Sequence, residues 1–267
     1  MSRFFILVFV LVSNAWANES LGTSTFADVL KKAQELRTRY EASEILIALD
    51  LDNTLLRAKQ NLGSDQWVEW QTEAISGRTP EALFESFEEM LQFQANLYQL
   101  STMRPTEENL PATVQSLQKW GHPTFILTSR SVFLRSSTER ELKNNQFWFE
   151  ASSPMPGVAV DILEPPFKRP VSFLNGIFMT SGHHKGEALD YFIKRSGKHF
   201  KAVLFVDDIE RHTKRVYDTF SARPELEIIT YRYSRTDSWV QEFKNAPKAG
   251  IIAQALELKQ LIAKLFQ

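Results

Sequence analysis

Short, largely apolar runs alternate with helix-like stretches over most of this chain, and this alternation limits how it can fold. The runs are typical of strands covered on both faces, as in a parallel sheet, and they lie at residues 45–49, 124–127, 176–179, 202–206 and 227–231. The stretches between them have apolar residues at helical spacing, at residues 107–120, 132–144, 186–196 and 211–220. Alternating strands and helices predict an α/β sandwich with a mostly parallel sheet and right-handed crossovers.

The length of 267 residues predicts one sizeable domain with a smaller insert. Residues 57–104 interrupt the alternation and show helical periodicity at 67–75 and 80–100. We expect this segment to form a small helical cap that leaves and re-enters the fold at one edge of the sheet. Residues 18–56 and 105–267 then make up the α/β core.

The sequence predicts three further features outside these elements. A helix over residues 24–40 begins at Thr25, a suitable N-cap. Four prolines between 147 and 169 and a β-type run at 158–163 predict an irregular excursion or a hairpin. Helical spacing over residues 251–266 predicts a C-terminal helix docked on the core.

The first residues have the three parts of a secretory signal peptide. Met1-Ser-Arg3 is a basic start, residues 4–12 are apolar, and a small-x-small site ends at Ala17. The apolar run is shorter than the ~20 residues that a membrane-spanning helix needs. We therefore expect residues 1–17 to be cleaved off near Ala17 and the soluble mature chain to be exported, to the periplasm if the source is a Gram-negative bacterium. An uncleaved N-terminal strand or anchor is the alternative.

Composition argues against several classes of function. The chain has no cysteine, so a lipid-modified N-terminal cysteine, a cysteine nucleophile and a thiolate metal site are excluded. The formal net charge is -1 at pH 7. No basic surplus favours nucleic acid, and recognition of an anion must therefore be local.

Two acidic residues, Asp50 and Asp52, directly follow the first apolar run. Side chains at positions i and i+2 of a strand point to the same side, so both carboxylates can converge on one ligand. Two close carboxylates raise each other's pKa unless a cation neutralises them. Mg²⁺ prefers oxygen ligands of this kind. A solvated Asp-x-Asp turn is the competing interpretation, but the preceding strand makes it less favourable.

Asp207 and Asp208 follow the apolar run at 202–206. Burial of adjacent carboxylates at the end of a strand requires a cation. Ligand sites of open α/β sheets lie beyond the carboxyl ends of the strands. We therefore expect the pair to complete a metal site together with Asp50.

A hydroxyl pair and a lysine suggest a phosphate site near the same edge. Thr128 and Ser129 close the second apolar run, where hydroxyls and free backbone N–H groups suit phosphate oxygens, although a simple helix N-cap is the usual role of such residues. Lys185 lies at a helix start within Gly182-His-His-Lys-Gly186. A cation there opposes the helix dipole and is favourable only beside an anion. For His183 and His184 we favour structural or indirect supporting roles.

These four motifs, in this order, resemble those of the haloacid dehalogenase-like superfamily of phosphohydrolases. The matching positions are Asp50-x-Asp52-x-Thr54, Thr128, Lys185 and Asp207-Asp208. The resemblance covers the predicted mature chain and implies a three-layer, Rossmann-like core with a helical cap. The export signal, Gly176-Ile-Phe-Met-Thr180 and Asp207-Asp-Ile-Glu210 are also similar to a bacterial branch, the DUF2608 proteins.

The resemblance implies a phosphatase that hydrolyses a small phosphate monoester through an aspartyl-phosphate. Asp50 is then the nucleophile and Asp52 the general acid and base. Thr128, Ser129 and Lys185 bind the phosphoryl oxygens. The ligands of Mg²⁺ are Asp50, the backbone carbonyl of Asp52, and one or both of Asp207 and Asp208.

The cap implied by the resemblance excludes bulk water and shapes the substrate pocket. Its Trp67 and Trp70 could stack on a substrate, but aromatic residues at i and i+3 of a helix favour a core role. Arg130 either contacts the substrate or pairs with an acidic side chain.

The same residues help to distinguish the phosphatase from other functions that this fold could have. A dehalogenase needs neither Mg²⁺ nor the second carboxylate, so Asp52 and the Asp207-Asp208 pair argue against it. A phosphotransferase has the same residues and differs only in its acceptor. A non-catalytic binding protein of the cell envelope would be expected to have lost a chemical residue, and none is missing.

Overall fold

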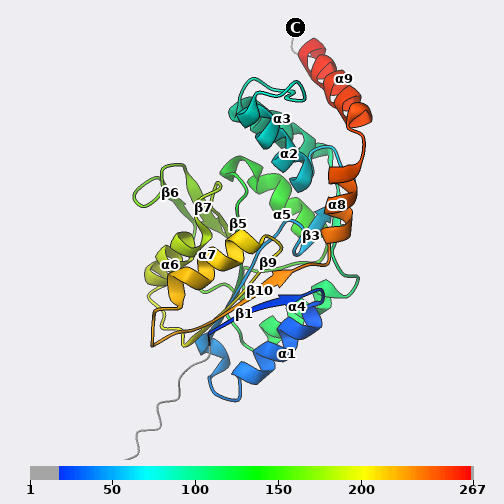
Figure 1. Cartoon of the computed structure of the whole chain (residues 1–267). Coiled ribbons are helices and arrows are strands. Elements are labelled where there is room, and N and C mark those ends of the chain that lie inside the picture. Colours follow the sequence, from blue (N-terminus) through cyan, green and yellow to red (C-terminus); the bar gives the residue numbers. More distant parts are fainter. Residues whose placement is uncertain (1–17, 266–267) are drawn as a thin grey trace, which may run out of the picture.

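The computed structural model describes residues 18–265, and its central feature is an eight-stranded sheet with helices on both faces (Figure 1). The strand order is β1-β10-β9-β2-β5-β8-β7-β6. Neighbours from β1 to β8 in this order pair in parallel, whereas β7 pairs antiparallel with both β8 and β6. The strands are β1 (Glu19–Thr23), β2 (Ile45–Leu49), β5 (Thr124–Thr128), β6 (Val160–Ile162), β7 (Val171–Leu174), β8 (Ile177–Met179), β9 (Ala202–Asp207) and β10 (Glu227–Tyr233).

The predicted α/β class with a mostly parallel sheet is confirmed. Successive residues of β2 face opposite sides of the sheet, as the pleat requires. Ile45 and Ile47 pack with one helix layer, and Leu46 and Ala48 pack with the other. The first layer contains α1 (Phe26–Leu36), α4 (Leu110–Lys119) and α5 (Arg135–Asn144), and the second contains α6 (Lys185–Ser196) and α7 (Glu210–Phe220). The result is a three-layer sandwich.

Each of the five predicted strands and the four intervening helices has a counterpart in the structure. The predicted N-cap of α1 is also confirmed, because the Thr25 side chain accepts a hydrogen bond from the Ala27 N–H at 3.2 Å. Residues 132–134 form a separate 3₁₀ turn before α5.

The predicted insert contains α2 (Asp65–Gly77) and α3 (Phe87–Leu100). Its two ends lie together in a short antiparallel ladder between β3 (Leu56–Ala58) and β4 (Met103–Pro105). Helix α3 begins later than the predicted residue 80, because Ser86 caps it and the Gln71 side chain bonds to the backbone of residues 81 and 83. The core role favoured for Trp67 is confirmed, since it is fully buried in the insert's own apolar cluster.

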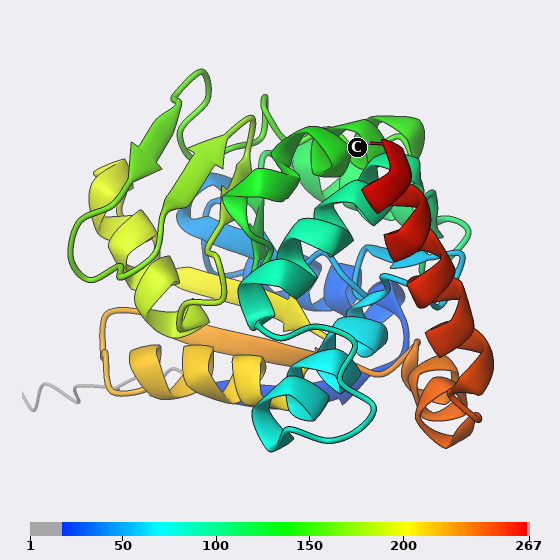
Figure 2. The ribbon, with the colours of Figure 1, turned by 90° about the horizontal axis from the view of Figure 1, so that it is seen from above.

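The C-terminal helix packs elsewhere than predicted. Helix α8 (Asp237–Asn245) contributes the buried Phe243 to the insert cluster, and α9 (Ala249–Leu265) packs Ile251, Leu258 and Ile262 against it. Figure 2 shows α9 along the outer side of the insert helices. The expected docking on the α/β core is therefore wrong. The apolar side chains of Leu256 and Leu261 are exposed.

The sequence did not indicate β1, β7 or α8. β1 is a short edge strand with partly exposed residues, and it is held by long-range pairing with β10. β7 forms the antiparallel partner of β6, but it lies just beyond residues 147–169, for which an irregular excursion or a hairpin was predicted. The predicted signal peptide, residues 1–17, lies outside the described residues. Within residues 18–265, the helices are too short or too polar to cross a membrane.

Candidate functional site

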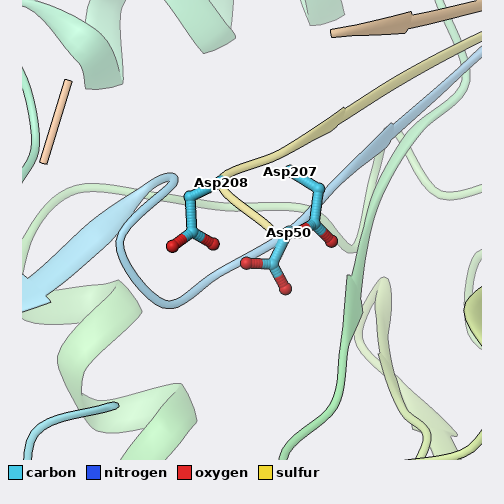
Figure 3. A group of neighbouring side chains, drawn as sticks. All are labelled: Asp50, Asp207 and Asp208. Atoms are coloured by element: carbon cyan, nitrogen blue, oxygen red, sulfur yellow. The ribbon is translucent and has the colours of Figure 1, made fainter. Parts of the chain in front are cut away.

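Three carboxylates meet where two neighbouring central strands end. β2 pairs with β9 so that Leu49 lies opposite Val206. Asp50 directly follows β2, and Asp207 is the last residue of β9. Asp208 follows directly. Each of the three carboxylates offers an oxygen within 4.8 Å of the others (Figure 3). The parallel register thus brings together the predicted acidic cluster of Asp50, Asp207 and Asp208.

A buried lysine faces this acidic cluster. Lys185 is the first residue of α6, and its Nζ donates to Oδ2 of Asp207 at 2.6 Å and to Oδ1 of Asp50. Among residues 18–265, it is the only lysine or arginine that forms an ion pair with the acidic cluster. The cluster of three carboxylates therefore has a single ammonium group beside it, which bonds to two of them.

Burial and mutual repulsion set the ionisation of the cluster. Burial raises the pKa of Asp50 and of Asp208, and the neighbouring carboxylates add to this effect. Burial also opposes ionisation of Asp207, but Lys185 and His212 outweigh it and hold the pKa of Asp207 below its usual range. Nδ1 of His212 lies 3.2 Å from Oδ2 of Asp207, and burial lowers the pKa of this imidazole. A neutral His212 can therefore donate to Asp207 without adding a charge.

The acidic cluster fits a hard divalent cation. Its side chains are at most 9% exposed. In the part of the chain that the structure describes, no donor or cation contacts the Asp208 carboxylate. A divalent ion with oxygen ligands would neutralise the excess of negative charge that Lys185 leaves.

Asp52 points to a different partner. Arg130 Nε donates to Oδ2 of Asp52 at 2.7 Å, and Nη2 donates to Oδ1 at 2.8 Å. Tyr98 of α3 lies beside this pair, with its hydroxyl 3.4 Å from Oδ1 of Asp52 and its ring 4.5 Å from the guanidinium carbon. Of the two roles considered for Arg130, the structure shows pairing with an acid, and that acid belongs to the first motif. The predicted metal contact of the Asp52 backbone carbonyl stays a prediction.

Hydroxyl groups connect the motifs around Asp50. Thr54 Oγ1 donates to Oδ2 of Asp50 at 3.3 Å and accepts from the Asp208 N–H at 3.0 Å. β5 pairs with β2, which brings Thr128 to the same edge of the sheet. The Thr128 hydroxyl accepts from the Arg130 N–H at 3.2 Å, and its own proton has no acceptor among the described residues. Thr128 and the partly buried Ser129 beside it are therefore positioned to donate to an anion.

Sequence reasoning missed three residues of the site, namely His212, Tyr98 and Asp65. His212 lies in the first turn of α7, five residues after Asp207. This short distance from Asp207 was the feature of the sequence that could have indicated a role in the site. Tyr98 and Asp65 come from the insert, and no local pattern connects them to Asp52. Partial burial, together with Asp52 and Glu69, raises the pKa of Asp65 to about 7.

The two histidines before Lys185 have the structural contacts that we expected. His184 caps α6 and accepts from the Glu187 N–H at 3.3 Å. His183 packs edge-on against Phe167 and accepts from the Arg169 N–H at 3.1 Å. Both histidines thereby fix the turn that leads into Lys185.

Comparison with known proteins gives two findings. The family described as "Protein of unknown function (DUF2608)" matches residues 22–265. A Chlamydia pneumoniae protein named "Putative outer membrane protein" is 25% identical over 183 residues, which are 67% of this chain and 65% of that protein. The chain thus spans just under two thirds of the relative's length.

Proposed function

The chain belongs to the DUF2608 family, and we propose that it is a Mg²⁺-dependent phosphatase of the haloacid dehalogenase-like superfamily. Its substrate is a small phosphate monoester, and the reaction passes through an aspartyl-phosphate on Asp50. The observation that carries the proposal is the buried acidic cluster with its single ammonium group at the carboxyl ends of β2 and β9. Three buried carboxylates beside one lysine need a further cation and offer a phosphoryl group a nucleophile.

The proposed reaction assigns a separate task to each motif. An Asp50 oxygen forms a bond to phosphorus while the bond to the ester oxygen breaks, and Asp52 gives a proton to that oxygen. Asp52 then takes a proton from the water that attacks phosphorus, while the bond between phosphorus and the Asp50 oxygen breaks and inorganic phosphate leaves. The bound Mg²⁺ would supply positive charge against the phosphoryl oxygens.

The chain's own donors hold the phosphoryl group in this scheme. Lys185, Thr128 and Ser129 donate to its oxygens, and Thr54 holds the attacking Asp50 in place. In the resting arrangement both oxygens of Asp52 face Arg130. Proton donation by Asp52 therefore requires that one of these bonds be exchanged for a contact with the leaving oxygen.

The insert serves as a cap over the site in this proposal, since Tyr98 of α3 reaches Asp52. We also propose that the chain is exported to the cell envelope. The name of the Chlamydia pneumoniae relative supports an envelope location, as does the signal-like start of the sequence.

The test of the function is release of phosphate by purified residues 18–267 from p-nitrophenyl phosphate, with and without Mg²⁺. We expect Mg²⁺-dependent turnover and a loss of about 10³-fold or more in kcat for Asp50→Asn, because the nucleophile is removed. Asp218→Asn is the matched control, since Asp218 is exposed and, among the described residues, pairs only with Lys214 on the same helix. Its kcat should stay within twofold of the wild type.

Other outcomes separate the competing functions. If phosphate is transferred to an added alcohol faster than to water, the protein is a phosphotransferase and not a phosphatase. Absence of phosphate release from any aryl or alkyl ester would favour a non-catalytic binding protein. Full turnover by Asp52→Asn would remove Asp52 from the acid and base role and leave the nucleophile assignment intact.

A further inference from the structure

A second basic group lies next to the proposed phosphate site and has no role in the proposed reaction. Arg169 comes just before β7, which runs antiparallel to β8. The start of β7 therefore lies at the edge where β8 ends, and this is also the edge where Thr128 ends β5. Arg169 itself is exposed.

The turn that holds Arg169 is bonded directly to the second motif. The N–H groups of residues 180–182 donate to the carbonyls of residues 128–130: Thr180 to Thr128 at 2.9 Å, Ser181 to Arg130 at 3.1 Å and Gly182 to Ser129 at 2.9 Å. Because these bonds fix the turn to the segment that carries Thr128 and Ser129, a group anchored on the turn keeps a constant position relative to the phosphate site.

Arg169 is anchored on this turn at several points. Its Nε donates to the Ser181 carbonyl at 2.7 Å, and its backbone N–H donates to Nε2 of His183 at 3.1 Å. Nη2 lies over Gly182, 3.5 Å from the place that a Cβ would take. The Ser181 hydroxyl also donates to the Pro170 carbonyl at 2.6 Å. The guanidinium plane is thus held by the protein rather than left free in solvent.

The outer nitrogens of this guanidinium lack a partner among residues 18–265. No carboxylate of residues 18–265 forms an ion pair with Arg169, and its Nη1 and Nη2 make no hydrogen bond there. The neighbouring charged groups are Lys168 and Glu187, which act on His183 together with Arg169. Lys185 is already bonded to the acidic cluster. A positioned fork without a carboxylate suits bidentate recognition of an anion.

We propose that Arg169 is a substrate-binding residue that selects phosphate esters with a second anionic group, a carboxylate or another phosphate, on the part that leaves. This inference rests on the proposed phosphatase function and names the substrate class of the same site. The scissile phosphate binds at Thr128, Ser129 and Lys185, and the second anion receives two parallel hydrogen bonds from Arg169.

Matched substrate pairs test the proposal. Glycerol 3-phosphate and 3-phosphoglycerate differ only in a hydroxymethyl group against a carboxylate, and fructose 1-phosphate and fructose 1,6-bisphosphate provide a longer pair. We expect the wild-type protein to have the higher kcat/KM for the anionic member of at least one pair. Arg169→Gln should lower the ratio of kcat/KM between the anionic and the neutral member about tenfold, through a higher KM for the anionic member. Arg169→Lys should keep part of the preference. Lys168→Gln removes the same charge from an unanchored neighbour and should keep the ratio.

Calorimetric binding of the same pairs to Asp50→Asn gives a readout that does not need turnover. The Asp50→Asn/Arg169→Gln protein should lose the difference in affinity between the two members. If the preference survives Arg169→Gln, or if Lys168→Gln lowers it equally, the proposal is overturned. If no ester is turned over but the binding preference is intact and depends on Arg169, the phosphatase function is contradicted. The inference about Arg169 then still stands.

Discussion

At the scale of single residues, the site divides into two charge systems. Asp50, Asp207 and Asp208 form a cluster that could hold a metal ion, and Lys185 bonds to the first two of them. Asp52, in contrast, has its own guanidinium from Arg130, which also donates to Thr138 Oγ1 at 2.8 Å. The second motif of the proposed phosphatase therefore carries a positioning group for the first motif as well as hydroxyls for phosphate.

We predict that Arg130→Gln lowers the free energy of unfolding by about 3 kcal/mol, because it leaves the largely buried Asp52 carboxylate without its cation. Urea unfolding of the single and double variants measures this. In Arg130→Gln/Asp52→Asn the unpaired charge is gone, so part of the loss should be recovered, with a coupling energy above about 1 kcal/mol. Strictly additive losses would show that the pair does not contribute as a unit.

At the scale of elements, the insert is held from two sides. The β3–β4 ladder joins its ends to the core. On the other side, Lys259 of α9 donates to the Leu83 carbonyl at 2.8 Å and to Glu89 at 3.0 Å, while Lys244 of α8 pairs with Glu69. The C-terminal helices thus hold the insert, which carries Tyr98, in place.

Two adjacent residues of α9 provide a matched test of this fastening. Ile262 packs against the insert cluster, whereas the Leu261 side chain is 53% exposed. We expect Ile262→Ala to cost about 1–2 kcal/mol and to speed hydrogen exchange of α2 and α3 amides, with β2 and β9 unchanged. Leu261→Ala should change stability by less than about 0.5 kcal/mol. Equal exchange in both variants would mean that α9 does not stabilise the insert.

At the scale of the whole molecule, the acidic cluster makes stability depend on pH and, if the proposed ion binds there, on metal. Burial raises the pKa of Asp50 and of Asp208 above their unfolded values. Their contribution to stability is therefore fully present below the unfolded pKa and is lost as pH rises through the folded pKa. The proposed divalent ion would remove that loss, because it would stabilise the ionised carboxylates.

We predict that 10 mM Mg²⁺ raises the thermal midpoint of residues 18–267 by about 5 °C at pH 8 and by much less at pH 5, where protons compete for the carboxylates. Differential scanning calorimetry measures both shifts. Asp208→Asn should remove most of the shift at pH 8, whereas the exposed Asp218→Asn should retain it. A shift independent of pH, or one that survives Asp208→Asn, would place the ion elsewhere.

Much of this arrangement could be predicted because it depends on local patterns. Each buried central strand is recognisable in the sequence as an apolar run. Asp50, Asp207 and Lys185 lie at or next to the ends of strands or helices, and the parallel sheet brings these ends to one edge. Asp52 was harder, because the rule that i and i+2 point to one side holds only within a strand. β2 ends at Leu49, and the backbone turns at Asn53, where φ is 57°.

The sequence by itself determined the α/β class, the central strands and the gathering of the acidic cluster with Lys185, because each follows from a few neighbouring residues. Only the tertiary structure decided that Asp52 pairs with Arg130, that Tyr98 reaches it from the insert, and that α9 packs on the insert instead of the sheet. The Arg130–Asp52 contact joins residues 78 positions apart in the sequence, and the Tyr98–Asp52 contact joins residues 46 positions apart. Such long-range packing is set by shape and burial in the folded chain, which no local spacing encodes.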